Sequence, residues 1–232
     1  MSKGYAALAL GALLLPVAAA GQVGHDPAHS PYRPITVRTG ITLVGGYLGG
    51  SGGKVDVGPT DGFLAGVRFD MRLTGPTDLT IGVTWNNLQR MVPHPAAPPD
   101  EQLTGPVHQP VLITEGGISI LLTGDKTWNG LAPYLGATIG LGFGGSVPED
   151  STEFGFRAKF ISGPHLGLRF YVSQAVFLRA EGRLLFWQLK YPTSFFVTPE
   201  GGEPLIDPRV NSDHEWTEQL SLQIGLGFTF RV

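Results

Sequence analysis

The chain has 232 residues, no cysteine and a formal net charge of −3 at pH 7, and only 15% of its residues are charged. The missing cysteine excludes disulfides, thiol nucleophiles, thiolate zinc sites and a lipid-modified cysteine. The absence of a sustained basic run excludes nucleic acid as a partner. An ordinary soluble protein carries about 25% charged residues, so this composition, with 34 glycines and 19 prolines, indicates a turn-rich β-protein whose surface is not entirely in water.

The N-terminus predicts a secretory signal peptide. Lys3 precedes an apolar stretch that ends at Leu15, and Pro16 and small residues follow up to an Ala-x-Ala pattern ending at Ala20. The stretch is shorter than the ~20 apolar residues that cross a bilayer as a helix. A retained membrane anchor is the alternative. We expect a signal peptide over 1–20, a periplasmic N-terminal segment over 21–33 and one barrel domain over 34–232.

Two histidines in the expected periplasmic segment, His25 and His29, have the spacing of metal ligands on a helix. Pro27 and Pro31 oppose a helix, and two ligands without a third make a weak site. Further on, the stretch GGSGGKV lacks the first glycine and the final Ser or Thr of a phosphate-binding loop. The sequence therefore predicts no metal site and no cofactor.

Apolar and polar residues alternate with period two in eight segments, which is the pattern of β-strands with two different faces. The last segment is the clearest, because Leu220, Leu222 and Ile224 alternate with Ser221 and Gln223. The eight segments lie at about 35–47, 63–73, 79–86, 110–123, 134–143, 165–171, 176–186 and 219–231. This predicts an all-β fold, an eight-stranded antiparallel up-and-down transmembrane β-barrel.

The connections between these segments alternate in length. Short turns such as TGPT and GDKTWNG alternate with long polar loops such as PHPAAPPDEQLTG and YPTSFFVTPEGGEPLIDPRVNSDHEW. Short turns at one end and long loops at the other are typical of a bacterial outer-membrane barrel, with the turns in the periplasm and the loops outside. An even number of strands places both termini on the periplasmic side.

The polar face of the predicted strands is rich in glycine and arginine and poor in lysine. A soluble, lipocalin-like barrel is the alternative fold, but it would show Lys and Glu rather than Gly on its outer face. We therefore expect the polar face to line a narrow lumen, in which Arg-acid-Arg triplets plug the interior; an ion-conducting constriction is the alternative. The predicted lumen charge network contains Arg38, Arg68, Asp70, Arg72, Glu115, Arg169, Arg179, Glu181, Arg183 and Arg231.

Aromatic residues lie near the predicted rims of the barrel, as a membrane-interface girdle requires. The histidines His94, His108 and His165 are predicted to be solvated or at a rim. The lysines lie in loops or near strand ends. The predicted girdle contains Tyr47, Trp128, Tyr171, Trp187, Tyr191 and Trp216.

With this strand pattern and the C-terminal stretch GLGFTFRV, the sequence resembles the eight-stranded outer-membrane β-barrel proteins of the OmpA and OmpX type. The resemblance covers about Ile35 to Val232. It implies a Gram-negative-type bacterium, a location in the outer membrane after export through the periplasm, and outer-membrane lipids and the outer-membrane assembly machinery as partners. Barrels of this type typically end on an aromatic residue, whereas Phe228 and Phe230 here precede Val232.

The leading functional hypothesis is a structural or surface-interaction protein that acts through its extracellular loops, with no catalytic residues. A small-solute or hydrophobe channel is the first alternative. A lipid A-modifying enzyme is the second, because Ser212, Asp213, His214 and Glu215 bring nucleophile and base types together in the last loop. Residues that are adjacent in sequence rarely converge as a triad. The sequence does not identify an extracellular partner.

Overall fold

The computed structural model describes residues 30–94, 97–98, 100–150, 152, 154–197, 204–207, 209 and 212–231. The chain divides into two compact units, Met1–Pro31 and Tyr32–Val232. The expected signal peptide and most of the expected periplasmic segment, with His25 and His29, lie outside the described residues.

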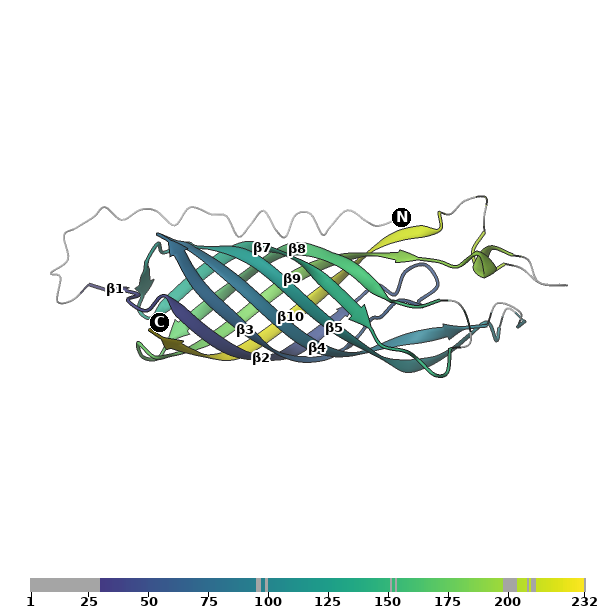
Figure 1. Cartoon of the computed structure of the whole chain (residues 1–232), viewed down its shortest axis with the longest axis horizontal. Coiled ribbons are helices and arrows are strands. Elements are labelled where there is room, and N and C mark those ends of the chain that lie inside the picture. Colours follow the sequence, from purple (N-terminus) through teal and green to yellow (C-terminus); the bar gives the residue numbers. More distant parts are fainter. Residues whose placement is uncertain are drawn as a thin grey trace, which may run out of the picture. The chain divides into compact units, whose positions relative to one another are not determined.

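The described part of the second unit is almost entirely β-structure (Figure 1). One short 3-10 helix, η3 (Thr193–Phe196), follows the ninth strand. Within the described ranges, no helix is long and apolar enough to cross a membrane. The strands are β1 (Tyr32–Pro34), β2 (Thr39–Gly50), β3 (Gly62–Thr74), β4 (Thr77–Pro93), β5 (Leu103–Leu121), β6 (Lys126–Trp128), β7 (Leu131–Gly144), β8 (Ala158–Tyr171), β9 (Val176–Lys190) and β10 (His214–Phe230).

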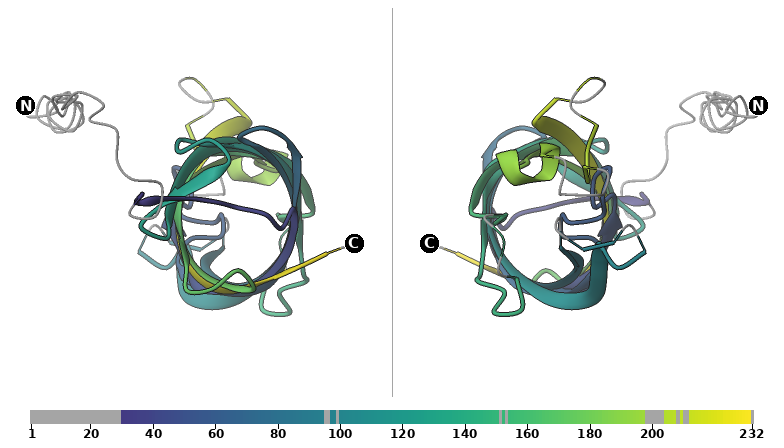
Figure 2. Two further views of the ribbon diagram at one scale, coloured as in Figure 1. Left: turned by 90° about the vertical axis from the view of Figure 1, so that its left-hand side faces the viewer. Right: turned by 90° about the vertical axis from the view of Figure 1, so that its right-hand side faces the viewer.

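Eight of these strands form a closed antiparallel barrel (Figure 2). Neighbours follow one another along the chain in the order β2, β3, β4, β5, β7, β8, β9 and β10. The barrel closes where β10 pairs with β2, from Gln219 opposite Gly50 to Phe230 opposite Thr39. Because the ladder is continuous, the barrel has no free edge strand. This confirms the predicted eight-stranded fold.

The two ends of the barrel differ as the connections predict. The short-turn end, on the left in Figure 1, holds the tight connections after β3 and β8 and the small β6 hairpin between β5 and β7. The long-loop end holds the connections at 51–61, 94–102, 145–157 and 191–213. β4 and β5 extend several residues further into this end than their alternation predicts, to Pro93 and from Leu103.

The outer wall of the barrel is an apolar belt. Along β10 the residues from Leu220 to Phe230 with even numbers are all exposed, and Ile224 reaches 73%. Corresponding residues of the other strands are exposed as well, including Ile81, Val83, Ile118, Leu135, Ile139, Leu141, Leu166 and Leu168. The apolar faces therefore point outward, as predicted. An apolar outer band with a polar interior is the arrangement of a transmembrane barrel.

The first predicted strand begins later than expected. β2 starts at Thr39, and the residues before it cross the mouth of the short-turn end (Figure 2, left). β1 pairs with β6, and the Ile35 amide donates a hydrogen bond to the Asp125 carbonyl at 2.9 Å. Ile35 packs against a small cluster that includes Ala132. The alternating residues 35–38 thus belong to a segment that covers the mouth of the barrel, not to a strand of the barrel wall.

Candidate functional site: two layers that fill the lumen

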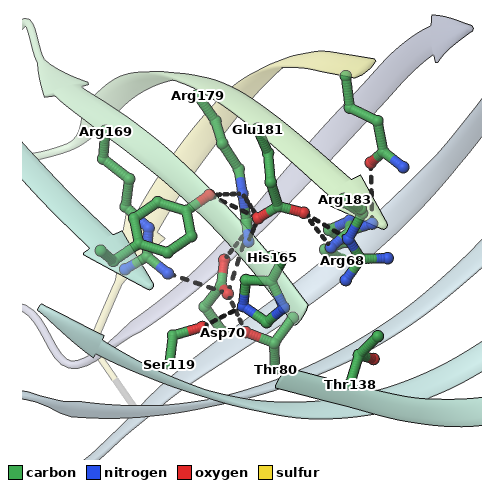
Figure 3. Close-up of polar contacts among 12 residues, drawn as sticks. Arg68, Asp70, Thr80, Ser119, Thr138, His165, Arg169, Arg179, Glu181 and Arg183 are labelled. Atoms are coloured by element: carbon green, nitrogen blue, oxygen red, sulfur yellow. Dashed lines mark hydrogen bonds and ion pairs between the residues drawn. The ribbon is translucent and has the colours of Figure 1, made fainter. Parts of the chain in front are cut away.

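Nine charged side chains point into the lumen from five strands, in the part of the barrel nearer the short-turn end. Figure 3 shows the central part of this group, including Arg68, Asp70 and Glu181. β3 and β9 contribute three each because every second residue of a strand faces the same side. No side chain among the nine is more than 8% exposed. This charged layer contains Arg68, Asp70, Arg72, Asp78, Glu115, Arg169, Arg179, Glu181 and Arg183.

Glu181 lies at the centre of the charged layer. Its Oε1 atom is 2.9 Å from an Arg68 guanidinium nitrogen and 2.7 Å from Arg183 Nε. Its Oε2 atom is 2.7 Å from Arg179 and accepts a hydrogen bond from the Tyr134 hydroxyl at 2.6 Å. One carboxylate therefore meets three guanidinium groups. Charge-assisted hydrogen bonds of this kind are among the strongest in proteins.

The charges continue from Glu181 to the short-turn end without a break. Arg179 also pairs with Asp70 at 3.0 Å, and Asp70 pairs with Arg169 at 3.2 Å. Arg169 then contacts Asp78 at 2.5 Å, and Asp78 contacts Arg72 Nε at 2.9 Å. Opposite charges alternate along this path, so each of its carboxylates has at least two guanidinium neighbours.

On the other side of Glu181, Glu115 completes the layer. It accepts hydrogen bonds from Arg183 NH1 at 2.5 and 2.6 Å, and its Oε1 atom is 3.0 Å from Arg68. Arg68 also donates to the Gln223 side chain at 2.8 Å, which links β3 to β10 past the intervening strand β2. The layer as a whole holds five arginines and four carboxylates, a balance of +1.

Aromatic rings occupy the spaces between the charged groups. The Tyr134 ring has the guanidinium carbons of Arg169 and Arg179 at 5.1 and 5.3 Å from its centroid, and a ring face attracts cations at this range. Inward-facing glycines leave the room for the rings. A Cβ atom on Gly136 would lie 2.6 Å from His165 Nε2, and one on Gly167 would lie 2.3 Å from the Tyr134 hydroxyl.

His165 is a correction to the sequence analysis. Instead of being solvated or at a rim, it is buried in the lumen, where Nε2 lies 2.8 Å from the Ser119 hydroxyl. Asp78 and Tyr134 also belong to the lumen but were not in the predicted network. All three occupy inward positions of the alternation: Asp78 lies two residues before the inward Thr80, Tyr134 two residues before Gly136, and His165 two residues before Gly167. The alternation of inward and outward positions alone would have placed all three side chains in the lumen.

Two residues of the predicted network lie elsewhere. Arg38 and Arg231 are exposed at the short-turn end, although both have inward parity in the sequence. Arg38 precedes β2, where its carbonyl accepts a hydrogen bond from the Arg72 amide at 2.7 Å, and Arg231 follows β10. Both therefore lie at the rim of the barrel. The prediction was wrong for these two because alternation continues past the point where the barrel wall ends.

Above the charged layer, toward the long-loop end, an apolar layer fills the same lumen. Trp187 is 0% exposed at its centre and meets the Phe156 ring edge-on at 5.4 Å between centroids. The layer comprises Leu48, Val57, Leu64, Leu88, Val111, Ile113, Phe154, Phe156, Ile161, Leu185, Trp187, Leu189, Tyr191, Phe195 and Ile206. The interior thus changes from ionic to apolar along β9, between Arg183 and Leu185.

The apolar layer corrects the predicted aromatic girdle. Trp187 and Tyr191 face inward and are buried, whereas Tyr47, Trp128 and Trp216 are exposed on the outside. Tyr171 is partly buried and packs beside the short-turn cluster. Trp187 shares the inward parity of Arg183 and Leu185 along β9, so its position in the alternation sets the face it occupies.

The long loops are fastened over the apolar layer by buried polar contacts. Arg90 of β4 pairs with Asp150 of the 145–157 loop at 2.5 Å, and both side chains are buried. Tyr191 donates to Glu215 at 2.6 Å, and the Lys54 amide donates to the same carboxylate at 3.0 Å. Burial and the Glu215 carboxylate raise the pKa of Tyr191 above its ordinary value.

The nucleophile and base types near the end of the last loop do not converge. The Ser212 hydroxyl donates to Asp213 at 3.5 Å, and His214 Nδ1 lies 2.7 Å from the same Asp213 oxygen. His214 contacts the Ser212 hydroxyl through its backbone amide, not its ring. All three residues are exposed. A hydrolytic triad requires the imidazole to accept the serine proton, and this arrangement does not provide that contact. Among the described residues, no group of three His, Asp or Glu side chains could hold a metal ion.

Comparison with known proteins adds information on the fold. No protein-family model and no curated protein matches the sequence. Among solved structures, Neisserial surface protein A matches with a TM-score of 0.52 at 14% identity, over 83% of this chain and 97% of that one. The outer-membrane protein OprG from Pseudomonas aeruginosa matches with a TM-score of 0.49 at 11% identity, over 84% and 97%.

The strand order, the outward apolar belt and the match to Neisserial surface protein A agree with one another. At this level of identity the likeness concerns the fold. The chain thus has the fold of the eight-stranded outer-membrane β-barrels, as its resemblance to the OmpA and OmpX type implies.

Proposed function

We propose that this protein is an integral outer-membrane barrel with a closed lumen, which acts as a structural or surface-interaction protein through its long loops. It is exported through the periplasm by its N-terminal signal peptide and inserted by the outer-membrane assembly machinery. The short-turn end faces the periplasm and the long loops face outward, which is the usual orientation of such barrels. Outer-membrane lipids surround the apolar belt.

The observation that carries this proposal is the filling of the lumen by two different layers. In the charged layer Arg68 is 0% exposed, and in the apolar layer Trp187 is 0% exposed. A solute that entered from either end would have to break buried ion pairs and also displace packed aromatic rings. An eight-stranded barrel leaves an interior only wide enough for side chains, which favours a closed barrel over a channel.

The test is conductance. Purified protein inserted in a planar lipid bilayer should give no current steps above the baseline, whereas a large porin measured in parallel should give them. Regular steps that persist after repurification would contradict the closed lumen and support the channel alternative.

The proposal contains no catalytic step, and the exposed, non-convergent arrangement of Ser212, Asp213 and His214 supports this. The matching experiment is mass spectrometry of lipid A from cells with and without the protein. Identical lipid A species are expected. The loss or gain of an acyl chain only in cells that express the protein would require an active site to be sought.

A further inference from the structure

A cleft of about 890 Å³ opens at the long-loop end, between the beginning of β8 and the end of β9. It exists because the β8–β9 ladder stops at Ile161 opposite Trp187, while β9 continues to Lys190 and there pairs with β10. Arg157 and Lys159 line one side. Lys190, Tyr191 and Phe196 line the other. The cleft is therefore a gap in the barrel wall above the end of the β8–β9 ladder.

The cleft differs from the lumen in having a larger excess of cations over acids. The charge of Lys159 is repelled by those of Arg157 and Lys190. Within the described ranges, none of the three forms an ion pair with a carboxylate, whereas all five arginines of the charged layer do. The one carboxylate among the described lining residues, Asp213, is paired with His214 at 2.7 Å. Asp213 also attracts Lys190. Three cations and one carboxylate still leave the cleft with a net charge of +2, and this favours an anionic ligand.

The position of the cleft indicates where such a ligand comes from. Phe160, the residue after Lys159, points outward into the apolar belt and is 53% exposed. On the facing strand, Lys190 lies opposite His214 of β10, two residues beyond the exposed Trp216. Aromatic girdles mark the boundary between lipid chains and headgroups. The cations therefore lie at the level of the headgroups, directly above exposed apolar wall.

We propose that this cleft binds a phosphate group of an anionic glycolipid in the outer leaflet, with its acyl chains lying along the wall below Phe160. The proposal deepens the proposed function, because it names one lipid partner at the long-loop end and assumes the orientation given above. Guanidinium and ammonium groups suit phosphate because they donate several charge-assisted hydrogen bonds. Arg157, Lys159 and Lys190 are the binding residues.

The experiment measures lipid binding to the refolded full-length barrel in detergent micelles by native mass spectrometry, so it does not depend on membrane orientation or on a closed lumen. The probes are diphosphorylated lipid A, the same lipid without phosphates, and soluble inositol hexakisphosphate. The test variant is K159Q/K190Q. The control K126Q/R231Q removes two exposed cations at the short-turn end. A second variant, K159R/K190R, keeps both charges.

We expect the wild-type chain and the control to bind diphosphorylated lipid A with the same dissociation constant. K159Q/K190Q should bind it about tenfold more weakly, and K159R/K190R should retain binding. The phosphate-free lipid and inositol hexakisphosphate should bind weakly to all four proteins. Folding of each variant is verified by its gel mobility before and after boiling.

Equal binding by K159Q/K190Q and wild type would overturn the site. Inositol hexakisphosphate binding as tightly as lipid A, with the same dependence on the two lysines, would overturn the lipid as its source and assign the cleft to soluble polyanions. If K159Q/K190Q fails to fold, the folded K159R/K190R variant decides the question. Loss of lipid A binding by K159R/K190R would then overturn the proposal. Retained binding by K159R/K190R, together with unchanged binding by the control, would support it. None of these outcomes bears on conductance, so the closed lumen is tested separately.

Discussion

Four carboxylates and five guanidinium groups share the interior of a narrow barrel, and neutralising any one of them removes an ion-pair contact from at least one buried partner. Removing ionic groups from water costs several kcal/mol each, and close pairing roughly offsets this cost. The intact charged layer thus contributes modestly to net stability. Its larger effect is on specificity, because Arg68 and Glu181 meet only if β3 and β9 are in the correct register.

Glu181→Gln removes the charge that three arginines share. Breaking a buried pair typically costs about 3 to 5 kcal/mol because the remaining charge stays buried and uncompensated. We expect a lower urea midpoint of unfolding for the refolded barrel, or a measurable conductance if the freed guanidinium groups reorient. Glu218→Gln is the matched control, since Glu218 is exposed on β10. Wild-type behaviour of both variants in both assays would favour a water-filled lumen with solvated charges.

The side chains of one strand can face three different environments in this barrel, and those of β9 face all three. Its outward side chains, such as Leu178, lie in the apolar belt. Its inward side chains are ionic from Arg179 to Arg183 and apolar from Leu185 to Leu189. The change lies between Arg183 and Leu185, so one strand supplies side chains to both layers.

Ile224→Arg tests the outer face. Ile224 lies in the middle of the exposed apolar positions of β10, and a cation near the bilayer midplane of such a barrel costs about 2 to 4 kcal/mol. Trp216→Arg, on the same strand in the rim girdle, should cost only about 0 to 1 kcal/mol. Urea titration of both variants refolded into lipid vesicles measures the difference. Equal costs would mean that the belt is assigned to the wrong depth.

Trp187→Ala tests the apolar layer. Truncating a fully buried tryptophan leaves a cavity and typically costs about 3 to 5 kcal/mol. Trp85→Ala is the comparison, because Trp85 is 55% exposed on the outer wall and leaves no cavity. The free energy of unfolding should therefore fall much further for Trp187→Ala. A larger loss for Trp85→Ala would show that the upper lumen is not packed as described.

At the scale of the whole barrel, the described strands form a continuous hydrogen-bonded ring whose lumen contains buried side chains. The ring closes through β10 and β2, the N-terminal segment crosses the short-turn mouth, and the buried Arg90–Asp150 pair holds the 145–157 loop at the other end. Because the ladder has no edge, unfolding must break many backbone hydrogen bonds together.

Heat modifiability follows from this closure. In detergent, unboiled protein should migrate as a compact species on a gel, and boiled protein should migrate at the position of the extended chain. A sample prepared without lipid or detergent, in which the barrel is not expected to form, serves as the unfolded reference. Identical mobility before and after boiling, together with recovery in the soluble periplasmic fraction, would contradict the membrane barrel.

Much of this architecture is determined by the sequence itself. Period-two alternation defines which side chains of a strand share a face, and the alternation of short and long connections predicts an up-and-down barrel with two unlike ends. That pattern does not predict the height of each residue along the barrel axis. Arg38 and Arg231 have inward parity but lie at the rim of the barrel, and Trp187 has inward parity but meets apolar neighbours.

Only the tertiary structure decided which charges meet, because pairs such as Arg68 and Glu181 are separated by 113 residues along the chain. Strand register sets the height at which each side chain enters the lumen, and curvature brings opposite walls within hydrogen-bonding range. The solvent outside the wall also changes along the barrel axis, from lipid to water. The two-residue alternation indicates neither the height of a side chain along the barrel axis nor the solvent outside the wall at that height.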